Sequence, residues 1–254
     1  MGDLLDFVTV AHGGLARWSS SQTVSAKADI YGPTWARKGQ GDLLGMCEVS
    51  ASINRQYLTL DSEQSGHTIV FDGALDRVTV TSSAGRIVER LDQPRLSLLR
   101  TDPAGPWTAA QVGYFVGYGM WGYLLEPYLF HLPGVHTREI EPWHERGETW
   151  RRLEVTFPES LATHETTIIY HFDSRTGLQR RMDYAPEVFG GRRGAHYTFE
   201  HRTWDGMPVP SQRRILIRDS AGHADHHSAL ILLDIHSFQF TSAEHQSPTS
   251  APSA

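Results

Sequence analysis

Side chains that can bind anions or move protons recur in the C-terminal half of the chain, within short apolar segments that predict β-strands. Successive strand residues point to opposite faces of a sheet, so a polar residue shares the face of the apolar residues two positions away. In residues 195–204, Tyr197 and Phe199 thus place His201 on the apolar face. Across the neighbouring strands, this alternation predicts an inner face carrying His164, Tyr170, Arg180, Tyr184, Tyr197, His201, Arg213 and Asp234.

These groups have the chemistry of an acid/base site. Imidazole titrates nearest to neutral pH, so His201 is a candidate general acid or base. Phenols can donate protons, and guanidinium groups hold anions through paired hydrogen bonds. The predicted catalytic residues are His201, Tyr184, Arg213, Tyr197 and His164, and the predicted substrate-binding residues on the strands are Arg180, Tyr170 and Asp234.

Each of these residues also has a structural interpretation. Arg180 and Arg213 could form ion pairs with acidic residues at the rim of the sheet, and His201 could be a core histidine bonded to Tyr184. A register shift of one residue would exchange Tyr197 for His196 at the inner face. The sequence leaves both interpretations open.

The segment 107–130 predicts a buried helix, because it is apolar and aromatic on all sides. Tyr114, Tyr118 and Trp121 lie on one of its faces. Such rings serve as core residues, or as flat walls for an aromatic or polycyclic ligand. We therefore add these three residues to the predicted substrate-binding set.

The elements around this helix predict an α+β fold that is mainly β. Residues 4–18 predict an amphipathic helix, and short strands with tight turns fill residues 24–91 and 149–240. Such strands form antiparallel pairs. We expect one half-barrel domain over residues 1–242, in which a curved sheet of about 11 strands wraps around the two helices. Residues 243–254 predict a disordered tail.

Composition excludes several classes of function. The chain of 254 residues has 23 basic and 29 acidic residues, a net charge of −6, which argues against nucleic acid as a partner. Cys47 is the only cysteine, so neither a disulfide framework nor a cysteine-based zinc site is expected. No nucleotide-binding or hydrolase motif occurs, and we predict no cofactor.

Three further expectations concern metal, membrane and location. His223, His226 and His227 have a spacing that could bind a metal, but a solvated turn explains them equally simply; no metal site is assigned. Residues 103–125 lack charge, yet their glycines make them only moderately apolar, which argues against a membrane span. The first residues do not form a secretory signal, which favours a cytoplasmic location. A homodimer is left open.

Two segments carry a resemblance to a known family. The segment Ala11–Trp18, which runs directly into the first strand, and the later hairpin Trp204–Pro210 resemble the LolA-like bacterial lipoprotein carriers. The resemblance implies an eleven-stranded half-barrel that closes over helices and shelters a hydrophobic ligand. That fold also hosts a cofactor-free enzyme that directs an indole rearrangement in violacein biosynthesis, but none of its catalytic residues transfers to this chain by motif.

Two functions follow from these observations. The first is a cofactor-independent lyase, isomerase, dehydratase or cyclase acting on a hydrophobic small molecule, which the polar inner face favours. The second is a non-catalytic carrier or sensor of a lipid-like ligand, which the resemblance favours. In a carrier, polar groups are expected at the cavity mouth; in an enzyme, they are expected deep inside and in contact with one another.

Overall fold

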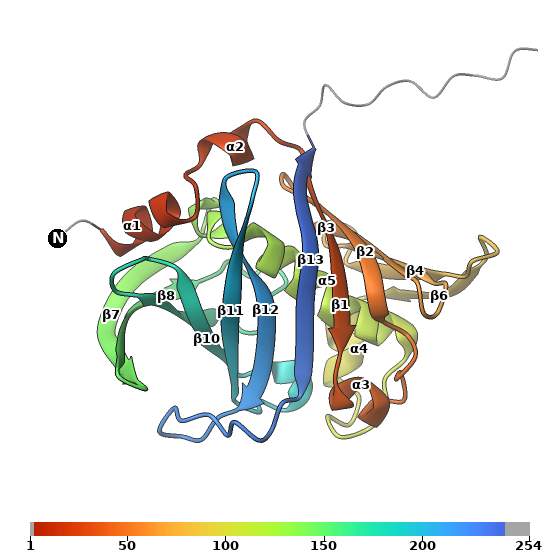
Figure 1. The fold of residues 1–254 in the computed structure, drawn as a ribbon. Coiled ribbons are helices and arrows are strands. Elements are labelled where there is room, and N and C mark those ends of the chain that lie inside the picture. The colour runs from red at the N-terminus through yellow and green to blue at the C-terminus, as the bar shows by residue number, and fades with distance from the viewer. Residues whose placement is uncertain (1–2, 242–254) are drawn as a thin grey trace, which may run out of the picture.

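One curved antiparallel sheet of thirteen strands forms the framework of the protein (Figure 1). The computed structural model describes residues 3–241. The strands are β1 (Thr23–Tyr31), β2 (Gly45–Ser52), β3 (Tyr57–Ser62), β4 (Thr68–Asp72), β5 (Arg77–Thr81), β6 (Ile87–Asp92), β7 (His136–Glu145), β8 (Glu148–Thr156), β9 (Thr167–Asp173), β10 (Gln179–Tyr184), β11 (Gly194–Trp204), β12 (Met207–Ile217) and β13 (Ile231–Thr241). Their order is β6-β5-β4-β3-β2-β1-β13-β12-β11-β10-β9-β8-β7. The predicted fold class is confirmed, with thirteen strands where about eleven were expected.

Five helices and two short 3₁₀ turns accompany the sheet within residues 3–241. They are α1 (Leu4–Ala11), α2 (Ala16–Ser19), α3 (Pro33–Arg37), α4 (Pro94–Leu99) and α5 (Ala109–Leu125), with 3₁₀ turns η1 (Tyr128–His131) and η2 (Glu187–Phe189). The chain leaves the edge strand β6 and reaches the opposite edge strand β7 through α4, α5 and η1. Figure 1 shows α5 behind β13 and β1, in the hollow of the sheet. This crossing explains why α5 is apolar on nearly every side.

The start of α5 is fixed by a capping box. The Thr108 side chain accepts a hydrogen bond from the Gln111 backbone N–H at 3.2 Å, and Gln111 Oε1 accepts one from the Thr108 backbone N–H at 2.9 Å. Such reciprocal bonds satisfy N–H groups that the helix itself leaves free. The helix therefore begins at a defined point above β3, β4 and β5, which it contacts.

Glycine is required where α5 meets the sheet. A Cβ atom at Gly117 would lie 2.5 Å from Phe71 Cβ and 2.9 Å from its Cγ, whereas a Cβ at Gly122 would meet nothing within 4 Å. We expect Gly117→Ala to destabilise the protein by about 1–3 kcal/mol through overpacking. Gly122→Ala should instead stabilise it by about 0.5–1 kcal/mol, because alanine favours the helix. Chemical denaturation of both variants checks the pair, and equal effects would contradict it.

Two predicted elements differ from the observed ones, and one observed strand was not predicted. The helix expected over residues 4–18 is divided into α1 and α2, since Gly13 and Gly14 between them have φ values of +96° and +77°. The helix expected over 107–130 ends at Leu125 and is followed by η1. The edge strand β7 was not predicted, because its charged residues lack a clear apolar alternation.

Other expectations fall partly outside what the structure describes. The predicted tail, residues 243–254, lies beyond residue 241, and the single domain over 1–242 stays a prediction. Within residues 3–241, none of the helices has the length and apolar character needed to cross a bilayer. In the same range, no three His, Cys, Asp or Glu side chains, His223, His226 and His227 included, are grouped to hold a metal ion.

Candidate functional site

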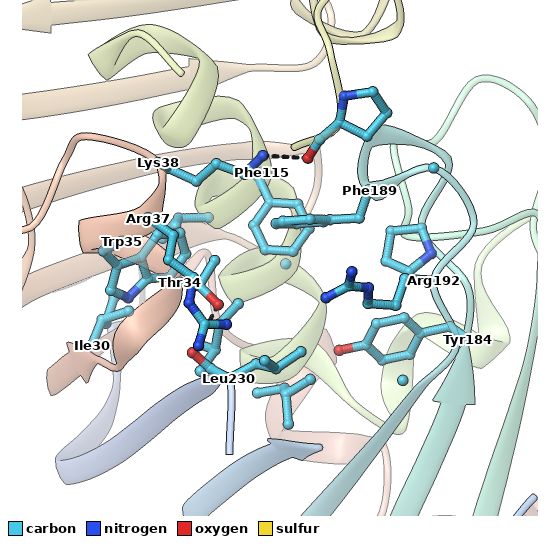
Figure 2. Close-up of a pocket in the computed structure, with 18 of the residues that line it drawn as sticks. Ile30, Thr34, Trp35, Arg37, Lys38, Phe115, Tyr184, Phe189, Arg192 and Leu230 are labelled. Atoms are coloured by element: carbon cyan, nitrogen blue, oxygen red, sulfur yellow. Dashed lines mark hydrogen bonds between the residues drawn. The ribbon is translucent and has the colours of Figure 1, made fainter. Parts of the chain in front are cut away.

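A cavity of about 860 Å³ lies on the concave side of the sheet, between α3, α5 and the loop that leads into β11 (Figure 2). This volume is typical of small-molecule sites, which are concave and mostly apolar. Its deeper wall is formed by buried apolar side chains: Trp35, Phe115, Val116, Met120, Ile215 and Leu233. The cavity can therefore remove a large apolar body from water, which is favourable by about 25 cal/mol for each Å² buried.

Cationic side chains gather at the rim of this cavity. Arg37, Lys38, Arg192 and Arg193 line it, with Asp102 as the one acidic lining residue among those described. Figure 2 shows the guanidinium groups of Arg37 and Arg192 approaching the cavity from opposite walls. A chain with a net charge of −6 thus presents a positive rim around an apolar interior.

Lys38 is the one of these cations that the fold itself holds in place. Its Nζ donates hydrogen bonds to Pro103 O at 2.6 Å and Gly105 O at 3.1 Å, and lies 4.3 Å from the centre of the Trp107 ring. Burial lowers the pKa of its ammonium group below the ordinary value. The side chain fixes the loop around Pro103 against the end of α3, and so shapes the rim.

A cluster of imidazole and phenol groups lies behind the apolar wall. His164 Nε2 is 2.6 Å from Tyr123 Oη, and its Nδ1 is 3.1 Å from Tyr118 Oη. The Tyr184 ring stacks on His164 with centroids 4.2 Å apart, and Tyr184 Oη is 3.2 Å from His196 Nδ1. Burial lowers the pKa of His164 to about 3. At neutral pH this imidazole is uncharged, so it donates through one nitrogen and accepts through the other.

A buried ion pair anchors the end of α5 to the middle of the sheet. Arg213 Nη2 lies 3.0 Å from Glu126 Oε2 and donates to Tyr123 O at 3.1 Å, and the Arg213 side chain is completely buried. Burial raises the pKa of Glu126, and the charge of Arg213 partly offsets this. The guanidinium group is thus held through Nη2, whereas its buried Nε and Nη1 have no hydrogen-bond partner among the described residues.

The residues predicted from the sequence are distributed over several places. Tyr184 is the predicted residue that lines the cavity; within the described chain, His164, Tyr118, Tyr170 and Arg213 lie in the buried region behind it. None of the hydrogen bonds among the described residues joins His201, Tyr184 and Arg213. These three residues are therefore not assembled as a catalytic group.

The remaining predicted residues serve other contacts. His201 is half-buried, with its ring 6.4 Å from that of His12. Trp121 donates its indole N–H to Ser52 O at 2.9 Å, which fixes α5 to the sheet. Tyr114 lines a separate hollow next to Arg95.

Three residues assigned to the inner face lie elsewhere, and these assignments were wrong. Tyr197 is on the convex face, where its hydroxyl donates to Glu145 at 2.6 Å, so the alternative register with His196 inside is the observed one. Arg180 sits at an irregularity of β10 and pairs with Asp173 at 3.3 Å. Asp234 is also outside: it accepts from Tyr31 Oη at 2.9 Å.

The physical reason for the error at Tyr197 is a second apolar cluster on the convex face, whereas Arg180 and Asp234 lie near register shifts. This cluster consists of Trp150, Ala195, Tyr197 and Leu216. The loop between β12 and β13 covers this side, where Gly222 O accepts from Arg181 at 2.6 Å. When a strand is apolar on both faces, the alternation of apolar and polar residues disappears. The sequence then does not show which residues face inward.

Sequence reasoning missed the residues that form the cavity rim. Arg37 and Lys38 follow Trp35 in a short segment between two strands, and Arg192 and Arg193 follow a Gly-Gly turn. The pairing of β1 with β13 brings these distant segments into one region. The sequence signal was the presence of adjacent basic residues in two loops of an acidic chain.

Comparison with known proteins identifies the fold. No family model matches the chain, and no curated protein matches its sequence. Among solved structures, a protein described as an outer membrane lipoprotein-sorting protein domain, from Vibrio parahaemolyticus, is similar with a TM-score of 0.53 and 6% identity, over 96% of this chain and 93% of that one. The half-barrel has the fold of this lipoprotein-sorting protein domain. A DUF1329 family protein from Desulfovibrio piger matches with a TM-score of 0.55 and 12% identity, over 96% and 93% of the two chains.

These likenesses establish the fold that the sequence resemblance implied. At such low identity they carry no site residues, and a shared fold does not imply a shared function. The function is therefore argued from the cavity and its rim.

Proposed function

We propose that this protein is a non-catalytic carrier that encloses a hydrophobic, lipid-like small molecule in the cavity beside α5. The observation that carries the proposal is the apolar cavity of about 860 Å³ with charged groups confined to its rim. This is the arrangement expected of a carrier rather than of an acid/base enzyme. A protein of the same fold described as lipoprotein-sorting gives further support.

The interior polar groups also favour a carrier over an enzyme. His164 contacts two tyrosines and stacks on a third, and Arg213 is paired with Glu126. Groups that already have partners inside the fold are typical of a structural network. Tyr123 and Tyr184 belong to this network and also line the cavity. Of the two, Tyr184 is the predicted catalytic residue and is the one to test.

Filling the cavity should weaken ligand binding. Val116 is a buried lining residue on α5, and Val116→Trp is expected to weaken binding of the uncharged dye N-phenyl-1-naphthylamine by about tenfold or more, a loss of about 1.4 kcal/mol. Val10→Trp, at a residue of α1 that is 74% exposed, is the matched control and should leave binding unchanged. The rise in dye fluorescence measures both affinities, with thermal unfolding as a check of the fold.

The chemical fate of the ligand distinguishes the carrier from the enzyme. A small molecule that copurifies with the protein should be recovered by mass spectrometry with its mass unchanged after long incubation. Tyr184→Phe should retain binding, because its ring remains in the cavity wall. Conversion of the molecule by the wild-type protein, lost in Tyr184→Phe, would refute the carrier and support the enzyme.

A further inference from the structure

The rim of the cavity holds arginines that have no internal carboxylate partner. Among the described residues, no ion pair or side-chain hydrogen bond involves Arg37, Arg192 or Arg193. Elsewhere in the same chain, Arg181, Arg213 and Arg214 are each paired with a carboxylate at 2.6–3.0 Å. The rim therefore carries uncompensated positive charge, although acidic residues outnumber basic ones in the sequence.

The other charged groups of the rim do not cancel this charge. Asp102 Oδ1 accepts a hydrogen bond from the Ala104 backbone N–H at 2.9 Å, within its own loop. Lys38 is committed to the carbonyl oxygens of Pro103 and Gly105. Three arginines from two separate segments thus remain available to a ligand. Arg37 ends α3, and Arg192 and Arg193 lie between η2 and β11.

The chemistry of the rim and the depth of the cavity together specify the ligand. Guanidinium groups bind carboxylates and phosphates with paired hydrogen bonds, and do so better than lysine does. The wall below them is apolar, with Trp35, Phe115 and Met120 among its buried residues. A neutral hydrocarbon would leave the arginines without a partner, whereas a small polar acid would leave the apolar wall empty.

We propose that the cavity selects an amphiphile with an apolar body and an acidic head group, a carboxylate or a phosphate, held at the rim by Arg37, Arg192 and Arg193. This inference rests on the proposed carrier function and adds the ligand class to it. The apolar body lies along α5, and the head group faces the rim between α3 and the loop before β11. Figure 2 shows the two walls between which the head group is placed.

Competition against a neutral dye tests the head-group preference. The protein is loaded with N-phenyl-1-naphthylamine, which is displaced with dodecanoic acid, dodecyl phosphate, 1-dodecanol or dodecyltrimethylammonium, all below their aggregation concentrations. Their twelve-carbon chains are the same, so differences report the head group. We expect at least one acid to displace the dye at a concentration about tenfold or more below those of the alcohol and the ammonium salt, since hydrogen bonds to charged groups contribute about 1.5–3 kcal/mol. The better of the two acids identifies the head group as carboxylate or phosphate.

Two triple variants with equal charge change locate the effect. Arg37→Gln/Arg192→Gln/Arg193→Gln should remove the preference for the acid and leave dye affinity within about twofold. The control Arg86→Gln/Arg175→Gln/Arg202→Gln changes three exposed residues outside the cavity and should keep the preference.

The outcomes separate this inference from the proposed function. If the wild-type protein does not bind the dye, the carrier proposal fails and this inference fails with it. If the dye binds and Val116→Trp blocks it, but acid, alcohol and ammonium compete equally, the carrier stands and the head-group inference is overturned. An equal loss of acid preference in both triple variants would also overturn it, because the effect would then come from overall charge.

Discussion

Replacing Arg213 with leucine is expected to destabilise the protein by about 3–5 kcal/mol, the largest effect we predict for a single substitution. The guanidinium group lies 3.0 Å from Glu126, whose side chain is only 2% exposed. Without Arg213, the carboxylate at the end of α5 would be buried with no opposite charge. Guanidinium chloride unfolding at neutral pH gives the free energy of unfolding that checks this value.

Two matched variants separate the buried pair from ordinary ion pairs. Arg138→Leu breaks the pair with Glu154, but the Arg138 side chain is 70% exposed, and the expected loss is at most about 1 kcal/mol. Arg213→Leu/Glu126→Gln removes both charges and should recover part of the stability lost in Arg213→Leu. A loss below about 1 kcal/mol in Arg213→Leu would refute the structural role assigned to this pair.

The sequence predicts the architecture better than it predicts the site. The apolar character of the segment that becomes α5 requires a covered position, and short turns require antiparallel neighbours, so a half-barrel around a helix follows from local pattern. The positions of Tyr184 and Arg213 inside also follow from alternation, because the strands that carry them are apolar on that face. His164 is inside too, but it lies in the bend before β9 and not on the strand that the sequence predicted there.

Alternation fails where the strand register changes. Arg180 lies at a register shift between β10 and β9, and a second shift between β1 and β13 lies next to Asp234. A bulge adds one residue and moves every later side chain to the other face. Local sequence carries little information about such bulges. The inward phase shown by Met182 and Tyr184, or by Phe238, therefore gives the wrong face for Arg180 and Asp234, which lie at or across a bulge.

The cavity rim is missed for a different reason. Its cations come from segments separated by about 150 residues in the chain, and they meet because β1 pairs with β13. No sequence pattern within a single strand or helix indicates that these two segments lie close together in the fold. Tertiary structure is needed to find this kind of site, whereas charge counts alone indicate an acidic protein.

Acidification from pH 7 to pH 5 is expected to cost the protein about 4–6 kcal/mol of unfolding free energy through His12, His164 and His201. The pKa values of the buried His171 and His196 are also lowered by burial, which adds to this loss. Burial lowers the pKa of His12 to about 4 and the pKa values of His164 and His201 to about 3. In the unfolded chain these imidazoles titrate near pH 6.5. Between the folded-state and unfolded-state pKa values, the unfolded chain binds more protons than the folded protein. The stabilisation by the neutral imidazoles is therefore fully present above pH 6.5 and decreases as the pH falls below it. At pH 5 each histidine accounts for a loss of about 2 kcal/mol.

Carboxylates do not produce the same change in this pH window. The hydrogen bond from Arg151 lowers the pKa of Glu139, so the stabilisation that it provides is lost only at more acidic pH. Glu126 acts in the opposite direction, because burial raises its pKa. The acid effect between pH 7 and pH 5 therefore belongs to the buried histidines. Guanidinium chloride unfolding of the wild-type protein at both pH values measures it.

Single substitutions can assign this pH effect to individual imidazoles. His164→Asn places an uncharged side chain among Tyr118, Tyr123 and Tyr184, and should lower stability at pH 7 but reduce the loss between pH 7 and pH 5 by about 2 kcal/mol. His136→Asn, at an exposed residue of β7, should leave that loss unchanged. If both variants keep the full pH dependence, His164 is not buried as a neutral group, and the imidazole–phenol cluster would have to be accessible to protons. In that case the wall behind the cavity would exchange protons with solvent, and the argument from the interior polar groups for a carrier over an acid/base enzyme would fail.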